Sequence, residues 1–223
     1  MTCDVIAFGE VLWDIIDGVP NLGGAPLNFA AHARRCGMKT AIVSAVGADD
    51  LGERTRARVR EEGVVDSCLF ESELPTGTVI VSVKDGIPSY DIRQPVAWDR
   101  IAFPADGQLP PVPRAFYYGT LAARDVVSRA TLMRMLDAYG NALTFYDVNL
   151  RQSYWDIPTV KTLLGAAGSM MTVSAWTVLF DPSQAQGCPS KPRFTSRQDS
   201  THAFGGDEKS GLGQCVEGCL VML

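Results

Sequence analysis

Histidine is scarce in this sequence, and no apolar run is long enough to cross a bilayer. The two histidines are His32 and His202, so few nitrogen ligands are available for a zinc site. Cys215 and Cys219 have a CxxxC spacing, but with so few histidines we do not expect them to bind zinc. A membrane-spanning helix needs about 20 consecutive apolar residues, and the apolar runs here are shorter. We therefore expect neither a zinc centre nor a membrane-spanning segment.

An excess of basic charge is also absent. The formal net charge is −5, which disfavours contact with nucleic acid or an anionic membrane because like charges repel. Residues 1–10 contain acidic residues and no basic residue, unlike the start of a signal peptide. We therefore expect a cytoplasmic enzyme with neither nucleic acid nor a membrane as its partner.

The cysteines do not predict disulfides, although the chain has six of them. Cys3, Cys36 and Cys68 stand singly in apolar or helical surroundings. A thiol in such a position is usually a small core residue.

Short apolar runs alternate with helical patterns over most of the chain. Strands are predicted at 4–10, 40–46, 115–119 and 143–149, and helices at 25–36, 50–62 and 126–139. Gly37 and Gly63 follow two of these helices, as expected for glycine beyond a helix C-terminus. The alternation predicts an α/β fold with a doubly wound parallel sheet.

Residues 79–92 break the alternation and predict a β-hairpin. Their apolar residues follow a period of two, with Asp85-Gly86 at the turn, which is a strong hairpin signal. A two-stranded hairpin is marginally stable alone and needs a partner. It could form a lid over the crevice at the carboxyl edge of the sheet, where ligands bind in such folds.

The composition changes near residue 166. Residues 181–215 are rich in Gly, Ser, Pro, Thr and Gln, and Leu212 is their only Leu, Ile or Val. Such a stretch cannot bury enough apolar surface to offset its ordering entropy. We predict a domain over 1–165 and a different tail over 166–223, irregular or disordered in 181–215, although 170–180 could still form a strand.

Several polar residues and glycines stand where a ligand could be bound. Gly23 and Gly24 precede a predicted helix with Asn28 in its first turn, where backbone can approach a ligand closely; most such glycine pairs are simply turns. Asp14 follows the first predicted strand. Its carboxylate could accept hydrogen bonds from adjacent sugar hydroxyls, or it could be a solvated loop acid.

A second polar group follows the strand at 143–149. Asp147, Asn149 and Arg151 alternate in the segment DVNLR, so their side chains point the same way if the strand continues. An arginine beside an acid can be a ligand clamp or a structural ion pair.

Residues 23–47, GGAPLNFAAHARRCGMKTAIVSAVG, resemble the first signature of the PfkB/ribokinase family of carbohydrate kinases. The residues at the family's spacings are Gly23, Gly24, Asn28, Ala30, Gly37 and Gly47. The Gly9-Glu10 pair, the TGT at 76–78 and the DVNLR segment are also similar to the family. GGAP and DVNLR together look most like fructokinases, with 2-keto-3-deoxygluconate kinases next.

The resemblance implies a ribokinase-like, Rossmann-like fold, with a doubly wound, mostly parallel sheet and a β-hairpin lid within about 76–100. It implies a kinase that uses ATP and Mg2+ to phosphorylate a primary hydroxyl of a sugar such as fructose, and a possible homodimer formed through the lid. The sugar-binding residues implied are Asp14, Gly23, Gly24 and Asn28, with Arg151 from the later strand and Tyr90 from the lid.

In the family, a second signature, GAGD, supplies the aspartate that acts as the catalytic base. This signature is not recognisable in the present sequence. The nearest string is AFGGDEKSGLG at 203–213, which contains Asp207. Phe204 replaces a small residue there and no apolar helix follows, so we interpret Asp207 as a chance match. The family's Asn-and-Glu magnesium motif and adenine-binding region are not recognisable after residue 165 either.

Two hypotheses for the tail follow. A truncation or reading-frame change near residue 166 would make the fold incomplete at its C-terminal end. Alternatively, the tail is a real divergent ending and leaves a sugar-binding protein without kinase activity. Either way, an uncovered sheet edge predicts poor stability or self-association. A Rossmann dehydrogenase is a more distant alternative, because no GxGxxG follows the first strand.

Overall fold

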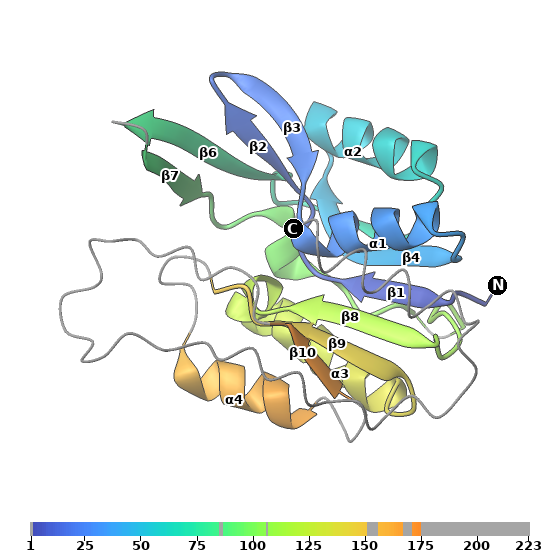
Figure 1. Ribbon diagram of the computed structural model, residues 1–223. Helices are drawn as coiled ribbons and strands as arrows, with labels where there is room; N and C mark the ends of the chain where they lie inside the picture. Colours follow the sequence, from blue (N-terminus) through green and yellow to red (C-terminus); the bar gives the residue numbers. More distant parts are fainter. Residues whose placement is uncertain (1, 85–86, 106, 151–155, 167–170, 175–223) are drawn as a thin grey trace.

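The computed structural model describes residues 2–84, 87–105, 107–150, 156–166 and 171–174. These residues form two β-sheets with helices packed around the larger one (Figure 1). Arg151, Asp207, the Asp85-Gly86 turn, the tail segment 181–215 and the pair Cys215 and Cys219 lie outside the described residues.

The larger sheet has six strands in the order β10-β9-β8-β1-β4-β5. Their bounds are Met171–Ser174, Leu143–Asp147, Ala115–Gly119, Val5–Phe8, Thr40–Gly47 and Val65–Ser72, in that order across the sheet. Every pairing between these strands is parallel, which confirms the predicted doubly wound sheet. β10 lies within 170–180, where a strand was predicted, whereas β5 was missed.

The chain reverses its direction across this sheet at β1. From β1 it continues through β4 and β5 on one side, and later through β8, β9 and β10 on the other. In open α/β sheets such a switch point opens a crevice beyond the carboxyl ends of the strands. The crevice is therefore expected next to Phe8 and Gly119, where β1 and β8 end.

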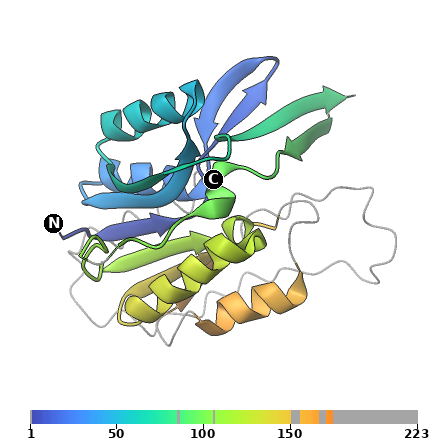
Figure 2. The same ribbon diagram turned by 180° about the vertical axis from the view of Figure 1, so that it is seen from behind.

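Helices cover both faces of the larger sheet (Figures 1 and 2). The α-helices are α1 (Ala25–Arg35), α2 (Asp50–Glu61), α3 (Val126–Ala138) and α4 (Ile157–Ala166), and two 3-10 turns are η1 (Ala97–Arg100) and η2 (Leu121–Arg124). The predictions of α1, α2 and α3 are confirmed to within a residue at each end. α2 and α3 begin at side-chain caps, since Asp49 accepts from the Gly52 N–H at 2.8 Å and Asp125 from the Val127 N–H at 2.9 Å.

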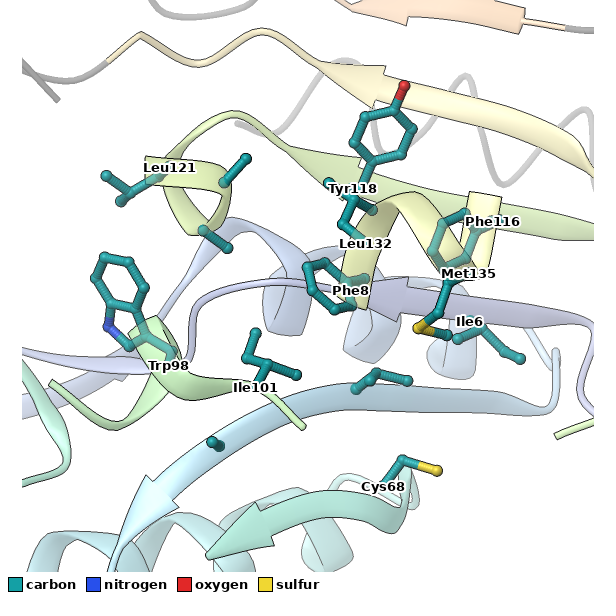
Figure 3. Packing of buried hydrophobic residues seen from close by; sticks show 14 of the residues in the cluster. Ile6, Phe8, Cys68, Trp98, Ile101, Phe116, Tyr118, Leu121, Leu132 and Met135 are labelled. Carbon is teal, nitrogen blue, oxygen red and sulfur yellow. The ribbon is translucent and has the colours of Figure 1, made fainter. Parts of the chain in front are cut away.

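Strand β1 separates two apolar cores because its side chains alternate between the faces. Val5 and Ala7 pack toward α1, whereas Ile6 and Phe8 pack toward α3. Figure 3 shows the second core, in which the fully buried side chains include Ile6, Phe8, Trp98, Ile101, Phe116, Tyr118, Leu132 and Met135. Burying each large apolar side chain stabilises the fold by about 1.5–3 kcal/mol.

Two of the three cysteines expected in the core are there. Cys3 and Cys68 are buried, and both are free thiols. Cys36 is exposed, because it caps the C-terminal end of α1 rather than belonging to its buried face.

The smaller sheet, called the lid sheet below, has four strands in the order β3-β2-β6-β7. Their bounds are Val19–Gly23, Leu12–Ile16, Gly77–Lys84 and Ile87–Ile92. The antiparallel pair β6–β7 confirms the predicted hairpin. The lid is larger than predicted, because β2 pairs in parallel with β6 and β3 pairs with β2.

The position of Asp14 differs from the one expected from the sequence. It lies in the middle of β2 rather than in a loop after the first strand. The missed signal is Asp17-Gly18, whose φ angles of 51° and 79° are both positive, as a two-residue type I′ hairpin turn requires. The same Asp-Gly dipeptide was recognised at 85–86 but overlooked here.

The base of the lid sheet is hydrogen-bonded to the larger sheet and its helices. Asp49 accepts from the Thr76 N–H at 2.8 Å and from the Thr76 hydroxyl at 2.6 Å, and that hydroxyl accepts from the Gly47 N–H at 2.9 Å. From β2, the Trp13 indole N–H donates to Thr55 Oγ1 at 2.9 Å. These bonds fix the end of β4 and the start of α2 against the lid strands.

A buried ion pair fixes the segment that leaves the lid sheet. Arg124 in η2 donates to both carboxylate oxygens of Asp99 in η1, at 2.8 and 2.9 Å. The Arg124 guanidinium lies over the Trp98 ring at 3.9 Å and also donates to the Arg93 carbonyl at 3.0 Å. Arginine suits this position because its planar fork satisfies a carboxylate bidentately while stacking on an aromatic ring.

Candidate functional site

The predicted ligand-binding glycines lie at the switch point, against the chain that leaves β1. A Cβ added to Gly24, whose φ is 112°, would collide with the Glu10 carbonyl oxygen. A Cβ added to Gly23 would lie 2.9 Å from Asp14 Oδ2. Gly24 therefore needs to be glycine, whereas a side chain at Gly23 would crowd the Asp14 carboxylate. The structure places Asp14, Gly23 and Gly24 side by side, and their binding of a sugar stays a prediction.

Helix α1 starts directly at these glycines. Gly24 is its N-cap, and the Asn28 N–H donates to the Gly24 carbonyl at 2.9 Å. Asn28 is half-buried in the first turn. Pro26 packs on Gly9, where an added Cβ would lie 2.7 Å from Pro26 Cγ. The helix N-terminus is thus held against the β1–β2 connection, and helix N-termini favour polar and anionic groups.

Tyr90 is on the same face of the lid sheet as Asp14. Tyr90 pairs with Val81, and Asp14 pairs with Val79, two residues earlier in β6; residues paired across strands, and residues two apart in a strand, share a face. The Tyr90 side chain is 37% exposed. Its predicted contact with a sugar stays a prediction, as does that of Arg151, which lies outside the described residues.

A buried tyrosine and aspartate stand on the other side of the switch point. The Tyr117 hydroxyl in β8 donates to Asp147 Oδ2 at the end of β9, at 2.7 Å. The Tyr117 ring stacks on Phe29 of α1, with a centroid separation of 4.3 Å. The Tyr117 pKa is raised well above its usual value by burial, then by the charge and hydrogen bond of Asp147, and also by the Glu10 charge. Tyr117 is therefore a neutral hydrogen-bond donor throughout the physiological range.

The segment that follows β9 is fixed to the end of β8. The Thr120 N–H donates to the Asp147 carbonyl at 3.3 Å, and the Thr120 hydroxyl donates to the Val148 carbonyl at 2.7 Å. Asn149 is 8% exposed, and its Oδ1 has no hydrogen-bond partner among the described residues.

The sequence analysis singled out Asp147 and Asn149, named Glu10 only as part of the family resemblance, and did not name Tyr117. Asp147 is 4% exposed and Glu10 is 2% exposed. Asp147 is the last residue of β9, and Glu10 follows β1 by two residues, so both stand at the carboxyl edge of the sheet. That position is the signal that could have found Glu10. Tyr117 has no such signal, because it lies inside an apolar strand.

No metal site or membrane-spanning helix is found in the part of the chain that the structure describes. No three His, Cys, Asp or Glu side chains there are grouped so as to hold a metal ion. No helix there is both long and apolar enough to cross a bilayer. The described residues alone therefore do not form a cage for Mg2+, which usually keeps several waters and binds through substrate phosphates.

A family model described as "pfkB family carbohydrate kinase" matches residues 7–173. A similar curated relative is the probable fructokinase-3 of Arabidopsis thaliana, 27% identical over 172 residues, which are 69% of this chain and 50% of the relative. The chain thus spans about half the length of the curated relatives it matches.

Solved sugar kinases have the same fold. A sugar kinase of Pyrococcus horikoshii aligns with a TM-score of 0.65 and 25% identity, over 73% of this chain and 62% of that one. The fructokinase of Vibrio cholerae O395 "in fructose, ADP and calcium ion bound form" aligns with a TM-score of 0.59 and 22% identity, over 73% of this chain and 57% of that one. These likenesses confirm the predicted ribokinase-like fold class.

Proposed function

This chain belongs to the pfkB family of carbohydrate kinases, and we propose that its described part is the sugar-binding portion of a fructokinase-type site. The reaction would transfer a phosphoryl group from ATP, with Mg2+, to the primary hydroxyl of a sugar such as fructose. One observation carries the proposal: the Asp14 carboxylate lies against Gly23, beside the helix start that holds Asn28.

The chemistry of these residues suits a polyhydroxylated ligand. The two carboxylate oxygens of Asp14 can accept hydrogen bonds from adjacent sugar hydroxyls. Gly23 and Gly24 leave room for the ring to approach the backbone, because neither has a Cβ. The Asn28 amide both donates and accepts, as sugar hydroxyls do.

The lid sheet would act by excluding water. Water competes with the sugar as a phosphoryl acceptor, and closure of a site strengthens electrostatic interactions inside it. Asp14 and Tyr90 share the face of the lid sheet that includes the buried Val79 and Ile92. A sugar bound to Asp14 would therefore be covered by the same element that binds it.

A second candidate function is sugar binding without turnover. Phosphoryl transfer depends on positioning and electrostatic stabilisation, and the GAGD signature that supplies both is not recognisable in the sequence. Asp207, which we interpret as a chance match to that signature, lies outside the described residues. We propose that this chain by itself binds the sugar and phosphorylates it slowly or not at all.

We also propose that two copies associate through the lid sheet. Val19, Ile16, Val81 and Tyr90 are paired in one row across all four strands, called the apolar row below. Val19 is 59% exposed, Ile16 41% and Tyr90 37%. A contiguous exposed apolar strip is typical of an association surface.

Thermal denaturation with and without sugar tests the main proposal. D-fructose should raise the Tm of the full chain. Asp14→Asn should abolish that rise, because one of the two carboxylate oxygens that accept hydrogen bonds becomes an NH2 group that donates them. The matched control is Asp91→Asn, on the opposite face of the lid sheet, which should leave the rise intact. A chain whose Tm responds to no neutral sugar would contradict the proposal.

Coupled phosphorylation of fructose with ATP and Mg2+ then separates the two functions. Turnover that Asp207→Ala abolishes would show that the tail supplies a catalytic base. A fructose-dependent rise in Tm without turnover would support sugar binding alone.

A further inference from the structure

Two residues of the proposed sugar site stand on different parts of the molecule. Asp14 lies in β2 of the lid sheet, whereas Asn28 lies in α1, which packs on β1 and β4 of the larger sheet. A ligand that bonds both side chains needs them at a defined separation, because a hydrogen bond is lost when its partners move apart by a few tenths of an ångström beyond about 3.2 Å. The contacts that hold the lid sheet against the rest of the molecule therefore bear on ligand binding.

Trp13 precedes Asp14 in β2 and points to the opposite face of the lid sheet. Neighbouring residues of a strand alternate between the two faces, and Trp13 pairs with Leu22 of β3 and Thr78 of β6. Leu22 packs against the core under α1. Trp13 is buried, whereas Asp14 is half-buried. One face of β2 thus packs on the body of the protein, and the other presents the proposed ligand residue.

Three groups of α2 converge on the Trp13 indole. Its N–H donates to Thr55 Oγ1 at 2.9 Å and to the Leu51 carbonyl at 3.2 Å. The Thr55 hydroxyl itself donates to the Leu51 carbonyl at 2.7 Å, which directs its acceptor side to the indole. The Arg54 guanidinium lies over the ring, 4.6 Å from its centroid. The N–H and one face of the indole are therefore both in contact with α2.

The start of α2 also holds the strand next to β2. Asp49, the N-cap of α2, accepts from the N–H and the hydroxyl of Thr76, directly before β6 begins. The first two turns of α2 thus hold both strands of the parallel pair β2–β6. The base of the lid sheet is fixed on α2, whereas its outer part, with the exposed Val19 and Tyr90, has fewer buried contacts to resist opening.

We propose that Trp13 is a positioning residue: by holding β2 on α2, it sets the place of the Asp14 carboxylate relative to Asn28. The proposal rests on the proposed sugar-binding function and adds a residue that acts through Asp14 without touching the sugar. Loss of the contacts of Trp13 with α2 lowers the fraction of molecules in which Asp14 stands in the binding position. The apparent affinity for the sugar falls in proportion to that fraction.

Titration calorimetry on the full chain tests the proposal with D-fructose as the probe. Trp13→Phe keeps an aromatic ring but removes the N–H, and should weaken fructose binding about threefold to tenfold. Thr55→Val removes one acceptor of that N–H and should weaken binding about twofold to fivefold, because the Leu51 carbonyl still accepts. Thr55→Ser retains the hydroxyl and should bind fructose as the wild type does.

Two comparisons separate positioning from general destabilisation. Tyr139→Phe also removes the hydrogen-bonding group of a buried ring, which donates to the Pro110 carbonyl at 2.9 Å. It should lower the Tm but leave fructose affinity unchanged, because Tyr139 follows α3 and has no role in holding β2. The double variant Trp13→Phe/Thr55→Val should bind fructose as Trp13→Phe does, since Thr55 acts on Asp14 only through the indole.

Each contrary outcome has its own meaning. Equal fructose affinity in the wild type, Trp13→Phe and Thr55→Val would overturn the positioning role while leaving the proposed function intact. A loss of affinity in Tyr139→Phe as large as that in Trp13→Phe would trace the effect to general destabilisation, and would also overturn that role. A folded wild type that does not bind fructose would overturn the proposed function and this inference together. If Trp13→Phe does not fold, Thr55→Val compared with Thr55→Ser decides.

Discussion

The two sheets of this protein are built differently. The strands of the six-stranded sheet are covered by helices on both faces, and β4 is buried along its whole length. The lid sheet extends away from the larger sheet (Figure 1), and Ile16, Val19 and Tyr90 are exposed on it. None of the large apolar residues described in β1, β4, β5, β8 and β9 is comparably exposed.

The two sheets therefore differ in stability, and residues that we propose to contact a ligand lie on the lid sheet and on α1, which covers the larger sheet. Local opening has the lowest free energy where few apolar contacts are buried, and that describes the outer part of the lid sheet. Asp14 and Tyr90 lie on this element, whereas Tyr117 and Asp147 lie on the larger sheet. A ligand between them would be bound by one rigid side and one side that can move.

The largest effect should come from the core of the six-stranded sheet. Phe8→Ala removes a fully buried ring of β1 from the core that also contains Leu132 and Met135 of α3, and should lower the free energy of unfolding by about 3–5 kcal/mol. Val81→Ala, at the half-buried member of the apolar row, should lower it by about 1 kcal/mol or less. Urea denaturation measures both, and equal losses would remove the contrast between the two sheets.

The next effect concerns the join between the sheets. Arg124→Met would leave the Asp99 carboxylate buried without its cation, and should cost about 3 kcal/mol or more of stability. The control Arg100→Met breaks the exposed pair with Asp125, at 3.2 Å, and should cost less than about 1 kcal/mol. If the two arginine variants have the same urea midpoint, the Asp99–Arg124 pair does not stabilise the base of the lid sheet.

A smaller, pH-dependent effect is expected at Asp49, the other contact at the lid base. Partial burial opposes its ionisation, but hydrogen bonds from Thr76 and from the Gly52 N–H outweigh that effect and lower its pKa. Its contribution to stability is therefore complete above its unfolded-state pKa, near 3.8, and is lost as the pH falls through the lower folded-state pKa.

Urea midpoints of wild type and Asp49→Asn between about pH 6 and pH 3 measure this contribution. The wild type should be the more stable at the upper end, and the difference should shrink on acidification. A difference that is constant across the range would contradict a lowered pKa at Asp49. Asp66→Asn, which removes the carboxylate of an ion pair with Arg60, is the control variant.

A substitution in the apolar row should have the smallest effect on stability but should clearly weaken association between copies. Val19→Thr should change the free energy of unfolding by less than about 0.5 kcal/mol, yet shift the chain toward monomer in sedimentation equilibrium. The control Val112→Thr is similarly exposed, at 53%, but lies outside the lid sheet. A wild type that is monomeric at all concentrations would contradict association through the lid.

Prediction from the sequence succeeded where the signal is local. The apolar runs of β1, β4, β8 and β9 are bounded by polar or glycine residues, so their strands could be recognised directly. The structure places Gly23 and Gly24 at the start of α1, as the sequence predicted, and their role in binding a ligand stays a prediction. α4 and β5 were missed; β5, VDSCLFES, mixes polar and apolar residues without a clean period.

Prediction failed where the lid is assembled from separate stretches of chain. The parallel pairing of β2 with β6 joins residues 12–16 to 77–81. No local sequence pattern near either strand predicts that pairing. Asp14 was therefore placed after the first strand rather than within a strand of its own, β2. The same limit applies to the site, because Tyr117 and Asp147 are 30 residues apart in the chain.

The sequence by itself determined the α/β alternation, the hairpin of β6 and β7, and the glycines at the start of α1. Steric limits on φ and the spacing of apolar side chains involve residues close together in the chain, so these features can be predicted from short stretches of sequence. Only the tertiary structure decided that β2 and β3 complete the lid sheet and that Tyr117 holds Asp147. Those contacts depend on which strands lie side by side, and that order is set by burial across the whole sheet rather than by adjacent residues.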